Sequence, residues 1–151
     1  MPTVERHAPR PVVAAAIIDE DGRLLAAQRS YPADLCGQFE LPGGKIEDGE
    51  TPAEALVREI LEELGCHITL TTPVLSPDPD GTWPILGGRR MTVWMARANT
   101  APQCGDGHLA LEWVSGEEAL RLDWLAPNRP IVEAVIQLIS SSETTDSPEV
   151  S

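Results

Sequence analysis

Short apolar runs separated by turn residues predict a chain that alternates between strands and helices. Residues 12–18 read Val-Val-Ala-Ala-Ala-Ile-Ile and precede the turn sequence Asp19-Glu20-Asp21-Gly22, a pattern typical of a buried strand and a tight turn. Residues 23–29 are interpreted as the hairpin partner of that strand. Further strands are expected at residues 39–41, 66–70, 91–96 and 109–114, with loops at residues 31–38 and 76–88.

A helix is predicted from Thr51 to Leu64. It opens on Thr51-Pro52-Ala53-Glu54, a capping box with proline at the first helical position, and Gly65 ends it. Before the helix, Pro42-Gly43-Gly44 predicts a break in regular structure. On a helical wheel the apolar residues fall on one broad face. These residues are Ala53, Leu56, Val57, Ile60, Leu61 and Leu64.

Two more helices are expected toward the C-terminus. A short one at residues 117–121 follows a second capping sequence at Ser115, and a longer one starts near Arg129-Pro130. We divide the chain into an N-terminal extension at residues 1–10, one domain at residues 11–140 and a polar, disordered tail at residues 141–151. Strands interleaved with helices over one domain predict an α/β fold, with helices on both sides of a mixed sheet.

The acidic balance of the chain limits what it can bind unaided. Lys and Arg number 11 against 24 Asp and Glu, a formal net charge of −13, which argues against a duplex nucleic-acid partner. A phosphate ligand would need a cation held by carboxylates as an intermediary. No apolar run is long enough for a membrane span or a signal peptide, so we expect no membrane partner and a cytoplasmic protein. Cys36, Cys66 and Cys104 are interpreted as small buried hydrophobes in a reducing compartment, without zinc or disulfide.

Three carboxylates form the first candidate site. Glu59, Glu62 and Glu63 are spaced i, i+3 and i+4 on the predicted helix, opposite its apolar face. Such neighbours repel one another, which favours a cation between them, although a solvated acidic face would show the same pattern. Just before the helix, Gly43-Gly44-Lys45 offers backbone amides that a phosphate can approach closely, and Glu50 lies in the turn that leads to the cap.

These residues carry a resemblance to a known family. Residues 44–66 read Gly-Lys-Ile-Glu-Asp-Gly-Glu-Thr-Pro-Ala-Glu-Ala-Leu-Val-Arg-Glu-Ile-Leu-Glu-Glu-Leu-Gly-Cys. This segment resembles the Nudix box, Gly-x5-Glu-x7-Arg-Glu-U-x-Glu-Glu-x-Gly-U, in which U is a bulky aliphatic residue. Only Cys66 departs from the pattern. The resemblance implies a Nudix α/β/α sandwich with a central mixed sheet, and a hydrolase that converts nucleoside triphosphates to the monophosphate and pyrophosphate.

The resemblance also implies roles for the residues of the box. Glu59, Glu62 and Glu63 would hold Mg²⁺ or Mn²⁺, with the backbone carbonyl of Gly43 or Gly44 as a further ligand. Glu59 would accept the proton of the attacking water. Two supporting residues belong to the same catalytic set. They are Arg58, which would orient a glutamate, and Glu50, which would support the loop or bind metal through water.

Outside the box the chain resembles the MutT branch, whose members act on 8-oxo-dGTP in nucleotide-pool sanitising and so in DNA repair. The matching residues are expected to bind substrate: Arg29, Glu40, Leu41, Pro42, Gly43, Gly44, Lys45 and Asn128. Residues 108–113 and 117–120 resemble the CTP pyrophosphohydrolases equally well, so CTP or dCTP stays open as the substrate. Other pyrimidine triphosphates, dinucleoside polyphosphates, nucleotide sugars and a non-catalytic nucleotide-binding module are further alternatives.

Asn128 bears on the choice of base. Its position matches the MutT asparagine that reads a purine, and an amide can donate to guanine O6 where a carboxylate could only accept. The alternative for Asn128 is a helix N-cap ahead of Arg129-Pro130, and the alternative for Arg29 is a surface strand residue.

Another departure concerns the metal site. Gly107 replaces a glutamate that relatives use for metal, and the adjacent Asp106 is a candidate substitute. His108, beside that gap, is a candidate site residue. The tryptophans are interpreted as core or pocket-wall residues, and among them only Trp83 is a candidate for a base-stacking lid. We expect a small nucleotide as the partner and a monomer or homodimer.

Overall fold

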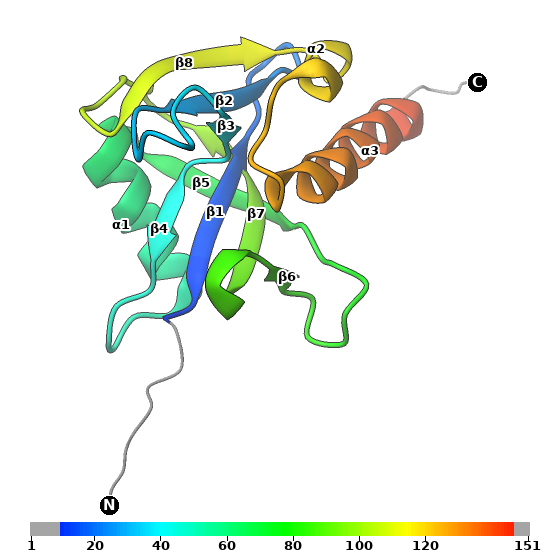
Figure 1. The fold of residues 1–151 in the computed structure, drawn as a ribbon. Coiled ribbons are helices and arrows are strands. Elements are labelled where there is room, and N and C mark those ends of the chain that lie inside the picture. The colour runs from blue at the N-terminus through cyan, green and yellow to red at the C-terminus, as the bar shows by residue number, and fades with distance from the viewer. Residues whose placement is uncertain (1–9, 147–151) are drawn as a thin grey trace, which may run out of the picture.

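The computed structural model describes residues 10–146, and in them two sheets lie between helices (Figure 1). The elements in chain order are β1 (Val12–Ile17), β2 (Leu24–Arg29), β3 (Phe39–Glu40), β4 (Gly43–Lys45), α1 (Pro52–Leu64), β5 (Ile68–Pro73), β6 (Trp83–Pro84), the 3-10 helix η1 (Leu86–Gly88), β7 (Arg90–Ala98), β8 (His108–Val114), α2 (Gly116–Arg121) and α3 (Asn128–Asp146). Within the described residues, no helix combines the length and apolarity needed to cross a membrane.

The strands divide between two sheets. A five-stranded sheet has the order β4-β1-β7-β5, with β6 paired to β7, and a three-stranded sheet has the order β3-β2-β8. β1 runs parallel to β7 and antiparallel to β4, so the larger sheet is mixed as predicted. The expected hairpin of β1 with β2 is wrong. Both edges of β1 are taken by β4 and β7, and only an isolated bridge joins Ile18 to Leu24.

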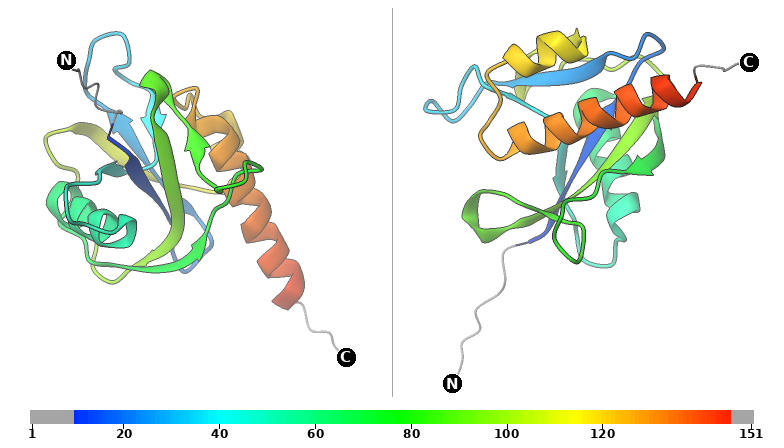
Figure 2. Two further views of the ribbon diagram at one scale, coloured as in Figure 1. Left: turned by 90° about the horizontal axis from the view of Figure 1, so that it is seen from below. Right: turned by 90° about the vertical axis from the view of Figure 1, so that its right-hand side faces the viewer.

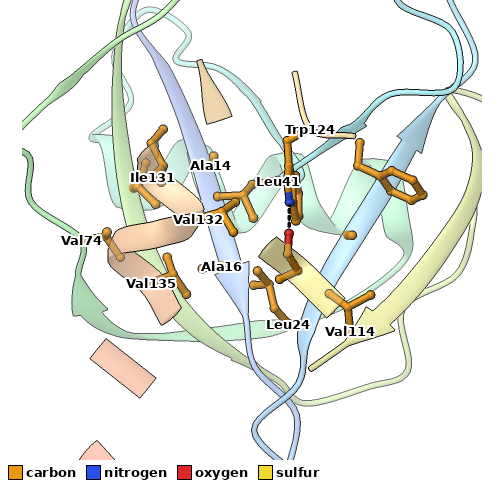
Figure 3. Packing of buried hydrophobic residues seen from close by; sticks show 14 of the residues in the cluster. Ala14, Ala16, Leu24, Leu41, Val74, Val114, Trp124, Ile131, Val132 and Val135 are labelled. Atoms are coloured by element: carbon orange, nitrogen blue, oxygen red, sulfur yellow. Dashed lines mark hydrogen bonds between the residues drawn. The ribbon is translucent and has the colours of Figure 1, made fainter. Parts of the chain in front are cut away.

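β1 separates two hydrophobic clusters. Its alternate side chains point to opposite faces: Val13, Ala15 and Ile17 pack with α1, whereas Ala14 and Ala16 pack with α3. Figure 3 shows the second cluster, with side chains of α3 directed toward the small alanines of β1. Figure 2 shows α1 and α3 on opposite sides of the sheets. The continuous apolar run of β1 follows from its burial on both faces, and the predicted α/β/α layering is confirmed.

α1 begins and ends as the sequence predicts, but its buried face is rotated relative to the predicted one. The Thr51 hydroxyl and the Glu54 side chain form the reciprocal capping box, and Gly65 ends the helix with a φ of 58°. The wheel was wrong for Val57 and Leu61, which are 37% and 40% exposed. The buried residues are Ala55, Leu56, Ile60 and Leu64. Ala55 lies beside Glu59 on the wheel, so the helix turns this side, and not that of Val57 and Leu61, toward the sheet.

Three further boundaries differ from the prediction. Gly43 to Lys45 form strand β4 rather than a break, because residues 12–14 of β1 pair with them. The predicted loop at 76–88 contains β6 and η1. Residues 141–146 continue α3 instead of starting a disordered tail. Residues 1–9 and 147–151, the ends of the predicted extension and tail, lie outside the described residues.

Candidate active site

Arg58 is the centre of a polar network that connects α1 with the loop preceding it. Its Nε and Nη2 donate to the two carboxylate oxygens of Glu50, at 2.5 and 3.0 Å, and Nη2 also donates to the Lys45 carbonyl. Its Nη1 donates to Glu59 Oε2 at 3.2 Å and to Glu62 Oε1 at 3.0 Å. The hydrogen bond from Arg58 lowers the pKa of Glu50. Arg58 therefore connects the loop after β4 with two carboxylates of α1. Its contact with Glu50 is bidentate, which a lysine could not reproduce.

Glu59 packs directly on Gly44 in the Gly43-Gly44 segment of β4, which we call the glycine loop. A methyl group at Gly44 would overlap the Glu59 carboxylate, with Oε2 only 2.6 Å away. Burial raises the pKa of Glu59, against the hydrogen bond from Arg58. Gly44 is therefore needed for the position of this carboxylate, because every larger residue would occupy the same space.

Glu63 lies one helical turn beyond Glu59 and faces the same side. Burial, with the negative charge of Glu59 as the next cause, raises the pKa of Glu63 to about 7. Two poorly solvated carboxylates are costly when a single cation, Arg58, pairs with only one of them, Glu59. This arrangement of oxygen donors fits a hard divalent cation such as Mg²⁺.

The side chains of the three predicted metal ligands do not converge on one point in this structure. Among residues 10–146, no three His, Cys, Asp or Glu side chains converge closely enough to hold a metal ion. The Glu62 carboxylate, whose side chain is 60% exposed, is turned toward Arg58. The three-glutamate ligand set therefore stays a prediction.

A cleft of about 260 Å³ opens beside these carboxylates. Seven predicted site residues line it: Arg29, Glu40, Leu41, Gly43, Gly44, Lys45 and Glu63. Six others do not: Pro42, Glu50, Arg58, Glu59, Glu62 and Asn128. The Pro42 carbonyl is instead used by the backbone N–H of Ala15. The structure thus brings six of the eight predicted substrate-binding residues to one cleft. Of the predicted catalytic residues, Glu63 lines the cleft and the other four do not.

One wall of the cleft is a connected chain of charged groups. Arg29 Nη1 donates to Glu40 Oε1 at 2.8 Å, and Glu40 Oε2 lies 3.0 Å from His108 Nε2. The His108 side chain is only 6% exposed. These contacts connect β2, β3 and β8. Arg29 is thus a partly exposed strand residue that is held by Glu40, its binding to substrate stays a prediction, and His108 belongs to the cleft.

Asn128 acts neither as a simple cap nor as a cleft residue. It is 5% exposed, and its Oδ1 accepts the backbone N–H of Leu41 at 3.0 Å. Because a backbone N–H can only donate, the amide oxygen must face Leu41 and Nδ2 must point elsewhere. The side-chain oxygen is thus used across the fold rather than by an N–H group of α3, and it holds the segment that lines the cleft.

Sequence reasoning missed several cleft residues. Ile85 and Arg89 flank η1, Met91 lies at the start of β7, and all three line the cleft. Within the described residues, neither Arg89 nor Lys45 has an ion-pair partner, whereas the adjacent Arg90 is paired with Asp78. Two consecutive arginines before a strand gave no signal of which one would be free.

Two other predictions are corrected, and Asp106 as a substitute ligand stays a prediction. Cys36 and Cys104 are exposed, whereas Cys66 is buried as expected. Trp83 is not a lid. It is 7% exposed, and its Nε1 donates to the Val74 carbonyl at 2.8 Å inside the core. Gly107 lines the cleft, and a Cβ added there would meet no atom within 4 Å. Asp106 is exposed and does not line the cleft.

The comparisons with known proteins agree with this geometry. A family model described as NUDIX domain matches residues 8–135. The chain belongs to the Nudix family. It is 36% identical over 126 residues to the CTP pyrophosphohydrolase of Escherichia coli K12, an alignment that covers 83% of this chain and 91% of that protein. It is 35% identical over 134 residues to the putative 8-oxo-dGTP diphosphatase 2 of Mycobacterium tuberculosis, which covers 87% and 91% of the two chains.

A solved structure gives the same result. The solution structure of the E. coli ORF135 protein matches this Nudix hydrolase with a TM-score of 0.70 and 34% identity, over 87% of this chain and 91% of that one. The Nudix box of the present chain occupies β4, the following loop and α1. It therefore supplies both the glycine loop and the carboxylates that the geometry brings together.

Proposed function

We propose that this Nudix hydrolase cleaves nucleoside triphosphates to the monophosphate and pyrophosphate, with a divalent metal as cofactor. The observation that carries the proposal is the charge arrangement of the cleft. Lys45 and Arg89, which have no ion-pair partner among the described residues, line the cleft together with the poorly solvated carboxylate of Glu63. The two relatives described above, a CTP pyrophosphohydrolase and a putative 8-oxo-dGTP diphosphatase, support the same substrate class.

Glu59, Glu62 and Glu63 would hold Mg²⁺ or Mn²⁺, together with the Gly43 or Gly44 carbonyl. When bound, the metal supplies positive charge that neutralises the phosphate oxygens and assists attack on phosphorus.

The residues of the chain divide the remaining work. Lys45 and Arg89 bind phosphate oxygens of the triphosphate through their free donors. Arg58 and Glu50 hold the loop against α1 and orient the glutamates. Glu59 accepts the proton of the attacking water, since Gly44 and Arg58 fix its carboxylate at the edge of the glycine loop.

We propose 8-oxo-dGTP as the substrate because of how Asn128 is oriented. Asn128 does not line the cleft, so this role requires the base to reach past Leu41. The Asn128 Oδ1 accepts the N–H of Leu41, so the group that such a base would meet is the donor Nδ2. A donor suits guanine O6, whereas it would face the exocyclic amine of cytosine donor to donor. CTP or dCTP is the second candidate, and the 36% identity to a CTP pyrophosphohydrolase favours it.

The first experiment is a panel of nucleoside triphosphates with Mg²⁺, scored for release of pyrophosphate. The highest kcat/KM is expected for 8-oxo-dGTP, ahead of CTP, dCTP, dinucleoside polyphosphates and nucleotide sugars. Binding of nucleotides without any release of pyrophosphate would support a non-catalytic module instead. Release of orthophosphate would contradict the proposed point of cleavage.

The second experiment is Asn128→Asp, with Asn99→Asp as the matched control. The new carboxylate can still accept the Leu41 N–H, so the structural contact is retained while the donor is lost. We expect kcat/KM for 8-oxo-dGTP to fall about 5- to 150-fold relative to that for CTP, because a mispaired buried hydrogen bond costs about 1–3 kcal/mol. Asn99 bonds Thr69 outside the cleft, and its change should leave the ratio unaltered. An unchanged ratio in Asn128→Asp would make Asn128 purely structural.

A further inference from the structure

Tyr31 is an exposed aromatic residue on the cleft that the reaction described above does not use. It is the single tyrosine of the chain, lies in the segment between β2 and β3, and lines the cleft. Its exposed fraction is 63%. Exposed apolar side chains are common on proteins, so exposure alone says little. The contacts that hold the ring are more informative.

The ring of Tyr31 is supported on one side by a fixed cation. The Arg29 guanidinium carbon lies 5.7 Å from the ring centroid, and Arg29 Nε donates to the Tyr31 carbonyl at 3.0 Å. Arg29 is itself fixed by Glu40, which contacts the buried His108 of β8. Arg29 is therefore oriented by groups on two other strands, and the aromatic ring that it supports remains open to solvent.

Among the described residues, no Phe or Trp ring lines the cleft, and the imidazole of His108, which does line it, is only 6% exposed and is held by Glu40. Trp83 and Trp124 are buried, and their indole N–H groups donate to backbone carbonyls in the core. Phe39 is also buried and packs edge-on against Trp124. A planar base that enters this cleft thus finds one exposed aromatic surface, that of Tyr31.

We propose that Tyr31 stacks on the nucleobase of the substrate, with Arg29 as the positioning residue behind it. The inference rests on the proposed nucleotide substrate and names how its base is held. Every base presents a π face, so stacking contributes affinity for nucleotides in general, and more for the larger purine ring. The choice between bases then falls to polar groups such as Asn128.

The test compares Tyr31→Phe, which keeps the ring, with Tyr31→Leu, which removes it. Substrates are dGTP, dCTP and ribose 5-triphosphate, which lacks a base. Tyr31→Leu should raise KM for dGTP about 5- to 150-fold and for dCTP by less, with KM for ribose 5-triphosphate unchanged. Tyr31→Phe should resemble the parent. Leu86→Ala is the control, because Leu86 is 62% exposed and does not line the cleft.

Calorimetric binding of dGMP to the same variants gives a readout that is independent of turnover. A parent protein that cleaves none of the triphosphates refutes the proposed function, and if it also fails to bind dGMP the stacking inference falls with it. An active parent whose Tyr31→Leu variant keeps its KM for dGTP, or loses as much on ribose 5-triphosphate, overturns the stacking alone.

Discussion

Substitution of Gly44 by alanine tests whether the packing of Glu59 on the glycine loop matters for catalysis. The added Cβ would lie 2.6 Å from Glu59 Oε2, against about 3.4 Å for ordinary contact. The carboxylate must therefore move by roughly 1 Å, and a misplacement of about that size costs on the order of 100-fold in rate. We expect kcat to fall by about that factor.

Stability should change little in Gly44→Ala. The atoms that the methyl group meets belong to the far end of a flexible side chain. Where the backbone tolerates alanine, replacing glycine lowers the entropy of the unfolded chain and so stabilises the folded protein by about 0.4–1 kcal/mol. The free energy of unfolding should stay within about 1 kcal/mol of the parent. In contrast, a Cβ at Gly43 would meet the backbone of Val13 in β1, so Gly43→Ala should destabilise the sheet.

Steady-state release of pyrophosphate and urea unfolding measure the two effects separately. Gly107→Ala is the matched control, because Gly107 also lines the cleft but has open space around its Cβ position. A Gly44→Ala enzyme with parental kcat would refute the assigned role of Glu59. A Gly44→Ala/Glu59→Gln double variant should lose little more than Glu59→Gln alone, since both changes remove one interaction.

The remaining predictions concern the metal and its ligands. Glu62→Gln and Glu63→Gln should each lower kcat by orders of magnitude with an unchanged melting temperature, and a fully active Glu63→Gln enzyme would contradict the metal site. Chelation should abolish activity, and added Mg²⁺ should raise the melting temperature of the parent but much less that of Glu63→Gln, because a ligand stabilises only the state that binds it. Gly107→Glu should lower the Mg²⁺ concentration needed for half-maximal rate, since Gly107 lines the cleft and a Cβ there would meet no atom within 4 Å. Asp106→Asn should raise that concentration only if Asp106 reaches the metal; an unchanged titration, as the exposed position of Asp106 suggests, rules it out as the substitute.

The sequence alone determined the local features of this protein. The capping box at Thr51 and the end of α1 at Gly65 depend on hydrogen bonds between residues three or four apart, so a short window of sequence contains all the groups involved. The same holds for the period of Glu59, Glu62 and Glu63 on the helix. The Nudix box, which is contiguous along the chain, carried the family assignment for the same reason.

Only the tertiary structure decided what depends on partners distant in sequence. The placement of β2 in a second sheet follows from which strands occupy the edges of β1, and the burial of Trp83 follows from the acceptor at Val74. The orientation of the Asn128 amide was set by the N–H of Leu41, 87 residues away. No local pattern encodes such pairs, because side chains far apart along the chain meet only after packing has selected one arrangement of the sheets and helices.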